Sequence, residues 1–396
     1  METLESEWGF QITLTGFAAA ILFSCGPFLY LVVAGRGLFI YLSIFFIMMV
    51  LLQAMANDGK YRYNFDTQQK IFLFCIGYQM LSFLWSPVSF TSGAYAYVKV
   101  VIFFLLITLN HYTEDDKKLI LFFQTVVAVF CVYQMITQGV EYTSYGNRLS
   151  FSFFGVSQDP NYMCLSLLFP IVWLTSIIID KTNKKRVSKL IAFIVLLFIL
   201  YGILRTGSRG GLLGAIVGIY LCVIQYRKID IKTLCTSIII IALVLLFWDR
   251  IIQVLPGNTA ERFTMETLMS NGGGGRTTVW LAYFVKWISS IWGMIFGYGN
   301  TSGAVLVMGG EGAHNYLIES LFEYGVMGTF ILAIFYGTLI KQAMIHKKKV
   351  ALSGLAATLV LALTLTVGRM VEFWLCITLT SVLISDSKNI DELDET

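Results

Sequence analysis

Long apolar runs recur along almost the whole chain, separated by short polar connections. Each run is close to 20 residues, the length that crosses a bilayer as a helix. We therefore predict an all-α polytopic membrane protein with about 12 transmembrane helices in one domain, residues 1–396. The predicted spans are Phe10–Ala34 (kinked at Pro27), Leu38–Met55, Ile71–Trp85, Gly93–Leu109, Leu119–Thr137, Asn161–Ile179, Val187–Leu204, Gly210–Tyr226, Ile231–Phe247, Tyr316–Ile340, Val350–Val367 and Met370–Ser385.

The same runs argue against a membrane β-barrel. A barrel strand alternates apolar and polar residues over ~10 positions, whereas runs such as Val187–Leu204 do not alternate. Composition agrees with a membrane protein, because 57% of the residues are hydrophobic, only 13% are charged and the mean hydropathy is +0.74. Soluble domains carry about 25% charged residues.

Basic residues divide the connections into two alternating sets, and this division predicts the orientation. Cytoplasmic loops are enriched in Lys and Arg, so the richer set is predicted to be cytoplasmic, which places both termini in the cytoplasm. That set holds Lys60, Arg62, Lys70, Lys117, Lys118, Lys181, Lys184, Lys185, Arg186, Lys189, Arg227, Lys228, Lys232, Lys341, Lys347, Lys348 and Lys349. The outer set holds Arg36, Arg148, Arg205, Arg209, Arg250, Arg262, Arg276, Lys286 and Arg369.

The outer set is nearly all Arg, whereas the inner set is mostly Lys. Lys and Arg orient the chain in the membrane equally well. However, a planar guanidinium binds phosphate with two hydrogen bonds and tolerates partial burial better than Lys. The pattern therefore favours an anionic ligand, a phosphate above all, at the outer face. Contacts of Arg with aromatic rings and headgroups at the membrane interface are the alternative.

Most outer connections are predicted to be tight turns, but residues 248–315 form one large extracytoplasmic loop between spans 9 and 10. Connections of this length are usually functional. Within it, Gly272–Gly275 lacks the GxxxxGK[ST] pattern of a nucleotide site and is interpreted as a hinge. Trp280, Phe284 and Trp287 follow at helical spacing, which predicts a helix with one aromatic stripe that packs on the bundle or the interface. Residues 386–396 form a cytoplasmic acidic tail.

The turn between spans 7 and 8 is a candidate anion site. Ser208 is suited to cap the following helix, which leaves backbone N–H groups and the positive end of the helix dipole beside Arg209. A helix start together with an Arg binds anions readily. Gly210, Gly214 and Gly218 follow at four-residue spacing, which allows another helix to approach closely.

His314 is the candidate general base, because the other two histidines, His111 and His346, fall in predicted cytoplasmic loops. Imidazole exchanges a proton near neutral pH without any perturbation. A structural role at the helix entry is the alternative. Glu319 and Glu323, one turn apart on the next span, could orient the ring or receive its proton.

Metal chemistry has little support in the sequence, and we expect no metal and no cofactor. A single outer His without neighbouring Asp, Glu or Cys offers no ligand set. The seven cysteines fall inside apolar runs without CxxC spacing and are interpreted as core residues. Asp115 and Asp116, in a predicted cytoplasmic loop, are interpreted as solvated.

Four short motifs, in this order, carry a family resemblance: Asp159-Pro160-Asn161-Tyr162; Ser208-Arg209-Gly210-Gly211; Gly275-Arg276 with Trp280 and Gly297-Tyr298-Gly299; and His314-Asn315-Tyr316 with Glu323-Tyr324-Gly325 and Gly328. With them, the chain resembles the Wzy-type O-antigen and capsule polymerases and the related O-antigen ligases. The predicted span number and the single large outer loop agree with this resemblance.

The resemblance implies an inverting glycosyltransferase that uses a polyprenyl-diphosphate-linked oligosaccharide without a nucleotide sugar or a metal. It implies that Arg209 and Arg276 hold the diphosphate and that His314 activates the acceptor hydroxyl or assists at the reacting centre. Arg205, Arg262 and Arg369 match no motif and are supporting candidates, as are Glu319 and Glu323. Asp159 and Asn161 could bind sugar or cap the helix after Pro160.

Three other functions compete with polymerisation. An O-antigen ligase would transfer the glycan to lipid A–core, and nothing in the sequence separates the two acceptors. A polysaccharide transporter or flippase is expected to show internal repeats and broken helices near the midplane, and no convincing repeat is visible. A scaffold of a polysaccharide-assembly complex would not need the outer Arg and His residues. Expected partners are the lipid-linked substrate, the bilayer, a chain-length regulator and a flippase, and no nucleic acid.

Overall fold

The structure, a computed structural model, describes residues 11–56, 65–88, 90–138, 141–142, 148–149, 152–153, 156–182, 184–226, 246, 248–253, 255, 257–264, 276–307 and 312–385. Within these residues the chain is almost entirely helical. Most of the predicted ninth span, the glycine hinge at 272–275 and the acidic tail at 386–396 lie outside the described residues.

The helices follow one another from one end of the chain to the other. They are α1 (Leu14–Ser24), α2 (Leu38–Ala56), α3 (Thr67–Leu81), α4 (Phe90–Thr108), α5 (Glu114–Gln138), α6 (Pro160–Ile179), α7 (Arg186–Thr206), α8 (Arg209–Tyr226), α10 (Trp248–Gln253), α11 (Gly257–Glu261), α13 (Arg276–Ile288), α14 (Ile291–Phe296), α15 (Gly303–Leu306), α16 (Tyr316–Ile345), α17 (Lys349–Ala362) and α18 (Val371–Ile384), with 3-10 turns η1 (Gly26–Phe28) and η2 (Ser82–Trp85).

Six of the described helices, α2, α5, α6, α7, α8 and α16, are long and apolar enough to cross a membrane. Shorter apolar helices accompany them at 14–24, 97–108, 349–362 and 371–384. The chain is therefore an all-α, multi-pass membrane protein, as the apolar runs predict. The count of about 12 spans and the extent of the large outer loop stay predictions.

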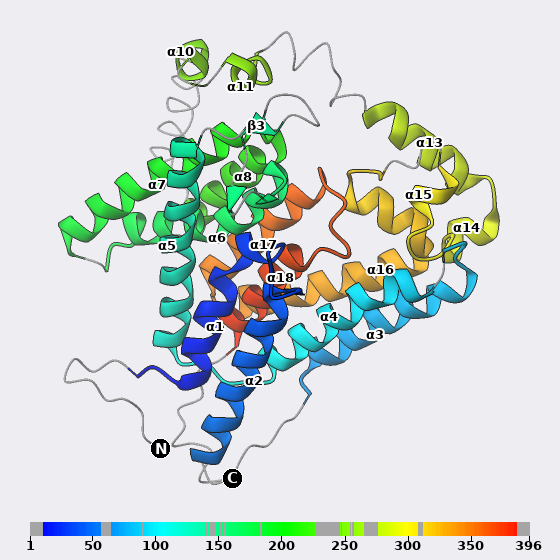
Figure 1. Ribbon diagram of the computed structural model, residues 1–396, viewed down its shortest axis with the longest axis horizontal. Coiled ribbons are helices and arrows are strands. Elements are labelled where there is room, and N and C mark those ends of the chain that lie inside the picture. The colour runs from blue at the N-terminus through cyan, green and yellow to red at the C-terminus, as the bar shows by residue number, and fades with distance from the viewer. Residues whose placement is uncertain are drawn as a thin grey trace.

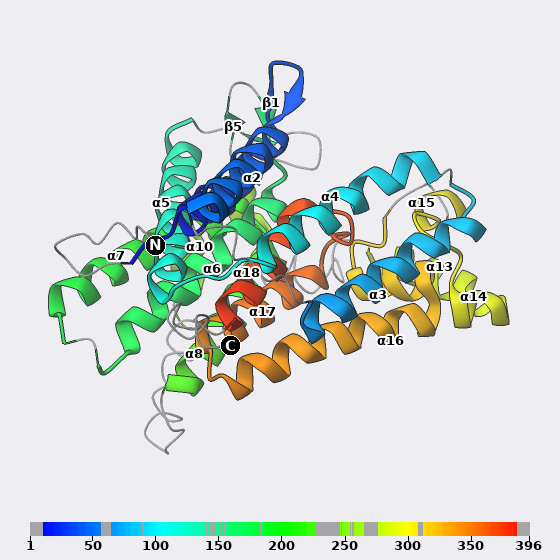
Figure 2. The same cartoon turned by 90° about the horizontal axis from the view of Figure 1, so that it is seen from below.

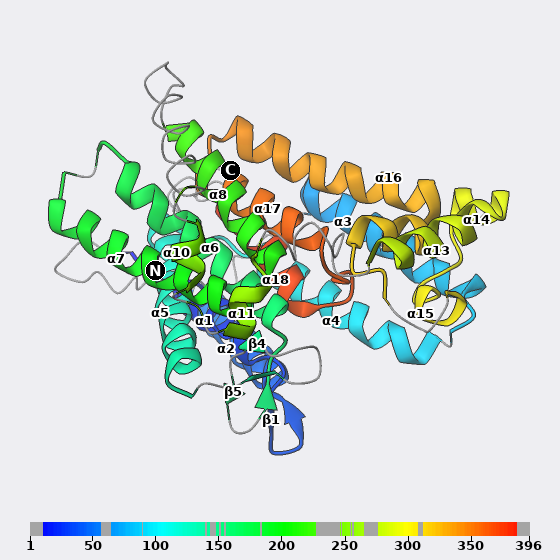
Figure 3. The ribbon, with the colours of Figure 1, turned by 90° about the horizontal axis from the view of Figure 1, so that it is seen from above.

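The helices pack in two groups that share α18. In Figure 1, α1, α2 and α5 stand side by side, and α6, α7, α8 and α17 lie next to them. Figure 2 shows the second group, in which α3 runs along α16 with α4 beside it. Seen from above in Figure 3, α8 and α17 are neighbours, and α13 and α14 gather at one end of α16.

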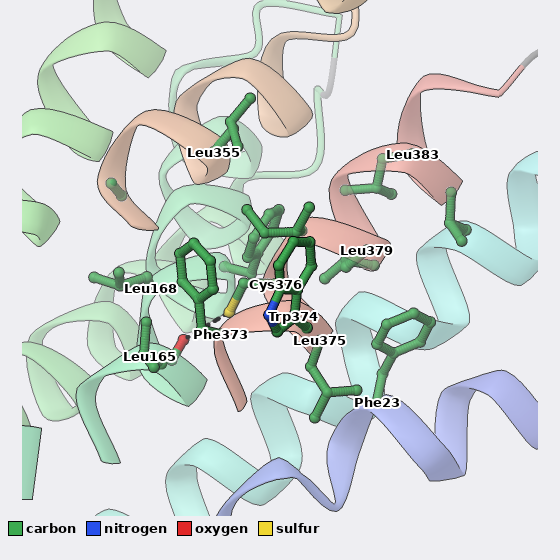
Figure 4. Close-up of a cluster of buried hydrophobic side chains, with 14 of the residues drawn as sticks. Phe23, Leu165, Leu168, Leu355, Phe373, Trp374, Leu375, Cys376, Leu379 and Leu383 are labelled. Carbon is green, nitrogen blue, oxygen red and sulfur yellow. Dashed lines mark hydrogen bonds between the residues drawn. The ribbon is translucent and has the colours of Figure 1, made fainter. Parts of the chain in front are cut away.

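Helix α18 is the centre of the core and is buried along most of its length. Its Trp374 and Phe373 are fully buried, and Figure 4 shows these rings beside Leu165 and Leu168 of α6. The thiol of Cys376 donates to the Leu165 carbonyl at 3.5 Å. The cysteines that the structure describes are free thiols, all buried except the half-buried Cys25, which agrees with their interpretation as core residues.

The predicted first span is too long at its C-terminal end. Helix α1 stops at Ser24, and η1 follows where Pro27 removes a helical N–H. A hairpin of β1 (Val32–Val33) and β2 (Arg36–Gly37) then replaces the helix, paired as Val32↔Gly37 and Val33↔Arg36. Its turn uses left-handed backbone at Ala34 (φ 47°) and Gly35 (φ 76°), which apolar periodicity does not reveal.

The connection between α5 and α6 is also not a tight turn. It contains two further antiparallel pairs, β3 (Glu141–Tyr142) with β4 (Arg148–Leu149) and β5 (Ser152–Phe153) with β6 (Val156–Ser157). More than one outer connection therefore has structure of its own.

The interpretation of Asp116 as a solvated residue is wrong. Asp116 is completely buried, and its carboxylate accepts hydrogen bonds from the Thr13 N–H (2.9 Å), the Thr13 hydroxyl (3.0 Å) and the Thr113 N–H (2.9 Å). The carboxylate satisfies backbone donors at the start of α1 and α5, where helices leave N–H groups unpaired. Asp116 thus ties two helix ends together.

Candidate functional site

The candidate site is built around the turn that joins α17 to α18, residues 363–370. Leu365 and Val367 are buried, whereas the residues that alternate with them, Thr364, Thr366 and Gly368, are only half-buried. One edge of this extended turn therefore faces the core and the other is available to polar partners. The predicted span 350–367 is wrong at this end, because α17 stops at Ala362.

Arg276 begins α13 and contacts this turn directly. Its Nη1 donates a hydrogen bond to the Thr364 carbonyl at 3.0 Å. One helical turn later, the Trp280 indole N–H donates to the Ala313 carbonyl at 2.7 Å. Helix α13 thus bridges the α17–α18 turn and the residue that precedes His314.

His314 lies two residues before the first residue of α16 and is exposed. Its φ is +45°, a left-handed conformation that is uncommon for residues other than glycine. The His314 N–H donates to the Thr366 hydroxyl at 3.1 Å. Asn315 caps α16, since its side-chain oxygen accepts from the Leu317 N–H (3.0 Å) and the Ile318 N–H (3.2 Å).

Arg209 is the first residue of α8, beside the predicted cap. Ser208 accepts a hydrogen bond from the Gly211 N–H at 3.1 Å, so the predicted cap is confirmed. The Nε of Arg209 donates to the Arg262 carbonyl at 3.0 Å, and the Nε of Arg262 donates to the Gly207 carbonyl at 3.1 Å. The Arg209 side chain is therefore anchored to the backbone of Arg262, and the Arg262 side chain to the backbone of the α7–α8 turn.

Helix α8 reaches the α17–α18 turn through Gly210. A side chain at Gly210 would collide with the hydroxyl of Thr364, the residue whose carbonyl accepts from Arg276. Gly214 and Gly218 similarly allow α17 close to α8: a Cβ at Gly214 would lie 2.8 Å from the Ala357 carbonyl. The glycine spacing is thus explained by packing, as the sequence predicts.

The start of α6 joins the same assembly. Asp159 accepts from the Asn161 N–H at 2.7 Å and caps α6, so the capping interpretation of Asp159 is confirmed. The Asn161 side-chain oxygen accepts from the Ser208 hydroxyl at 2.8 Å. The Tyr162 hydroxyl donates to the Thr366 carbonyl at 3.0 Å. The motif at 159–162 therefore connects α6 to α8 and to the turn.

Glu319 and Glu323 are both buried, with 6% and 3% of their surfaces exposed. Arg369, from the α17–α18 turn, has Nη2 4.0 Å from Glu319 Oε1. Burial acts to lower the pKa of Arg369, but the charges of Glu323, Tyr97 and Glu319 outweigh burial and raise it above the ordinary value. The structure therefore pairs the Glu319 carboxylate with the Arg369 guanidinium.

Arg205 lies outside this group of contacts, near the end of α7. Its Nη1 donates to the Tyr201 hydroxyl at 2.9 Å, and its guanidinium carbon stands 5.7 Å from the centre of the Tyr201 ring. This cation–π contact agrees with the alternative interpretation, in which outer arginines contact aromatic rings.

The aromatic stripe of the large loop lines a small apolar cavity between α13 and α16. The cavity has a volume of about 70 Å³ and is lined by Trp280, Tyr283, Phe284, Trp287, Ile318, Leu321 and Phe322. The stripe thus packs against α16, as one of the two sequence alternatives proposes. Burial and the charges of Glu319 and Glu323 raise the pKa of the Tyr283 hydroxyl beside this cavity.

Helix α16 is broken at Gly325, two residues beyond Glu323. Gly325 has φ 65° and ψ −171°, a conformation open only to glycine. The carbonyls freed by the break accept from the Tyr298 N–H (2.9 Å, to Phe322) and the Gly299 N–H (2.9 Å, to Glu323). The motif Gly297-Tyr298-Gly299 therefore fixes the N-terminal segment of α16, which begins two residues after His314.

Thr364 and Thr366 are the positions that the sequence analysis did not single out. Their signal was present, because apolar and polar residues alternate from Leu363 to Val367 at the end of an apolar run. Alternation is typical of extended backbone rather than of helix. Among the described residues, no three His, Cys, Asp or Glu side chains are grouped so that they could hold a metal, and metal independence stays a prediction.

Comparison with known proteins gave one family model and a structural match. Residues 192–333 match the model of a family described as O-antigen ligase. No curated protein matches the chain. A solved structure from the study "Structural coordination of polymerization and crosslinking by a peptidoglycan synthase complex" is 12% identical, with a TM-score of 0.49, and the match covers 82% of this chain and 98% of that chain.

The matched segment runs from α7 into α16 and contains Arg209, Arg276 and His314. The resemblance that the motifs carry is therefore confirmed. Residues 192–333 of this multi-pass membrane protein therefore match an O-antigen ligase family model, a match consistent with the O-antigen ligase/polymerase superfamily.

Proposed function

We propose that this protein polymerises polyprenyl-diphosphate-linked oligosaccharide repeat units of a bacterial surface polysaccharide, O-antigen or capsule. One observation carries the proposal. The Arg276 side chain donates to the Thr364 carbonyl and the backbone N–H of His314 donates to the Thr366 hydroxyl, while α8, which Arg209 begins, packs on Thr364 through Gly210. A candidate base and two candidate phosphate ligands thus belong to one local assembly.

The two arginines supply what a diphosphate leaving group requires. Guanidinium groups bind phosphate oxygens with paired, charge-assisted hydrogen bonds. Arg209 and Arg276 each begin a helix, where the positive dipole end adds to the attraction. Neutralising the charge that develops on the diphosphate lowers the barrier to its departure, and we propose that this occurs without a metal.

His314 would activate the acceptor. Neutral imidazole takes the proton of the acceptor sugar hydroxyl while that oxygen attacks the anomeric carbon. The bond from this carbon to the diphosphate breaks, and the leaving diphosphate keeps the electron pair. Attack from the face opposite the leaving group inverts the anomeric configuration. The exposed position of His314 lets the imidazole return its proton to water after each transfer.

The second candidate is an O-antigen ligase, because the matching family model carries that description. A ligase would use the same donor and leaving group but pass the glycan to lipid A–core. We place the reaction at the outer face of the bacterial inner (plasma) membrane, with both termini in the cytoplasm, and expect a flippase and a chain-length regulator as partners.

Complementation of a strain that lacks its polymerase tests the proposal. Wild-type protein is expected to restore a ladder of repeat lengths on a gel, whereas His314→Ala, Arg209→Ala and Arg276→Ala should each leave a single repeat unit. Two matched controls are His346→Ala, at the opposite end of α16, and Arg250→Ala, on α10; both side chains are exposed, and both variants should give normal ladders.

Three outcomes separate the alternatives. Loss of the ladder in the three site variants, at normal membrane levels, supports the polymerase and its site. A wild-type protein that restores no ladder in this strain, but restores transfer of carrier-linked polymer in a strain that lacks its ligase, is a ligase. Wild-type ladders from all three variants would disprove the site.

A further inference from the structure

The left-handed backbone of His314 needs a group that holds it in place. At φ +45°, the residue is strained, and strain of this kind persists only where the surroundings impose it. On the C-terminal side the constraint is Asn315, whose side chain caps α16. On the other side, the hydrogen bond that the His314 N–H donates goes to the Thr366 hydroxyl, at 3.1 Å.

The loop before α16 is wrapped closely around this hydroxyl. A Cβ at Gly312 would lie 2.9 Å from the Thr366 Oγ1, so residues 312–314 approach it from two positions. The Thr366 backbone is also fixed, because its carbonyl accepts from Tyr162 of α6 at 3.0 Å. Leu365 and Val367 on either side are 2% and 0% exposed. The backbone of Thr366 is therefore held in place beside the backbone of His314.

We propose that Thr366 is a positioning residue for the transfer reaction: its hydroxyl fixes the backbone of His314 so that the imidazole meets the acceptor oxygen. This inference rests on the proposed role of His314 as the base. Two residues away, the Thr364 carbonyl binds Arg276 at 3.0 Å. The same short turn thus fixes the distance between the base, His314, and the diphosphate ligand, Arg276. In-line displacement depends on this distance.

A valine and a serine at position 366 separate this role from packing. Thr366→Val keeps the shape but removes the acceptor for the His314 N–H, whereas Thr366→Ser keeps the hydroxyl and loses a methyl group. Displacement of a catalytic group by about 1 Å costs on the order of 100-fold in rate. We expect Thr366→Val to lower kcat by about that factor with KM for the lipid-linked donor little changed, and Thr366→Ser to stay close to wild type.

Transfer is measured with full-length protein in membranes and a purified lipid-linked repeat unit. Thr338→Val is the matched control, because the Thr338 hydroxyl only donates to the Ile334 carbonyl of its own helix at 2.9 Å; its kcat should not change. Gly312→Ala should also lower kcat. Its effect should be smaller in a Thr366→Ala background, where the colliding oxygen is absent.

The proposal is overturned if Thr366→Val keeps wild-type kcat, if Thr366→Ser loses as much as Thr366→Val, or if only KM rises. Failure of the proposed function is seen separately. It appears as a wild-type protein that does not extend the repeat unit, or as a fully active His314→Ala. If wild type transfers glycan to another acceptor instead, the ratios of the Thr366 variants still test the positioning role on that reaction.

Discussion

At the scale of single residues, the buried carboxylate of Glu319 is the group near the site that most needs a counter-ion. Its side chain is 8% exposed and Arg369 Nη2 lies 4.0 Å away, while the Arg369 side chain remains 32% exposed. Among the described residues, Glu319 Oε2 has no hydrogen-bond partner. A buried charge that loses its counter-ion is far more costly than the loss of an ion pair at the surface.

Arg369→Leu is therefore expected to destabilise the protein more than Glu319→Gln. Removal of the cation leaves two buried carboxylates, which we expect to cost roughly 3 kcal/mol, at the low end for buried pairs because Arg369 is partly solvated. Thermal unfolding in detergent, followed by size-exclusion chromatography, measures the loss. The double variant should recover part of it, and Arg250→Leu serves as the exposed control. Additive effects in the double variant would contradict the pairing.

The sequence identified the charged members of the site because such residues are rare in this chain. His314 is one of three histidines, and Arg209 and Arg276 stand out among a set of Lys-poor outer loops. Thr364 and Thr366 could not be found in the same way. A threonine has no charge. The hydrogen-bond acceptors of these two threonines reach Arg276 and His314 only after the chain has folded.

At the scale of elements, the break in α16 shapes the site most. The break is locked by three glycines: a Cβ on Gly297 would collide with the Glu323 carbonyl, one on Gly325 with the Ile295 carbonyl, and one on Gly299 would lie 2.6 Å from Ser86 Cα. The Tyr78 hydroxyl donates to the Tyr324 carbonyl at 3.2 Å. Backbone groups within a membrane must be satisfied in this way when a helix is interrupted.

Gly325→Ala should accordingly unfold the outer half of α16. Its φ of 65° with ψ −171° costs a non-glycine residue about 1–3 kcal/mol, and the collision with the Ile295 carbonyl adds to this cost. We expect a loss of at least about 3 kcal/mol in stability and no detectable polymer. The measurement is the thermal midpoint of the purified protein, together with the surface glycan ladder.

Gly337→Ala, on the same helix, is the matched control. No atom lies within 4 Å of a Cβ at Gly337, so alanine should stabilise α16 by roughly 0.5–1 kcal/mol. An equal response of both variants would show that the break is not required.

The pattern of apolar runs predicted the helices well and their interruptions poorly. Run length reports that a segment is helical and membrane-embedded, which is why α5 to α8 and α16 agree with the predicted spans. The φ of Gly325, the hairpin after α1 and the extended turn at 363–370 depend on contacts with distant segments. A glycine in an apolar run is indistinguishable in sequence from one that only permits close helix packing.

At the scale of the whole molecule, α16 relates the candidate site to the charge asymmetry of the chain. Beyond the break at Gly325, residues 326–345 form about 30 Å of uninterrupted helix, enough to span a hydrocarbon core of about 30 Å. His314 precedes α16 and Lys347, Lys348 and Lys349 follow it. If these lysines are cytoplasmic, the base and the turn that supports it must face the opposite side of the membrane, where a flipped lipid-linked glycan is available.

This orientation can be tested with single cysteines and a maleimide that does not cross membranes. Thr277, on α13, and Lys181, between α6 and α7, are both exposed. Thr277→Cys should be labelled in intact spheroplasts, whereas Lys181→Cys should be labelled only after permeabilisation. Background should be low, because the described native cysteines are buried except the half-buried Cys25, and Cys25→Ser serves as the background strain. The reverse pattern would put His314 in the cytoplasm, where a base at this position could not act on a glycan already moved across the membrane.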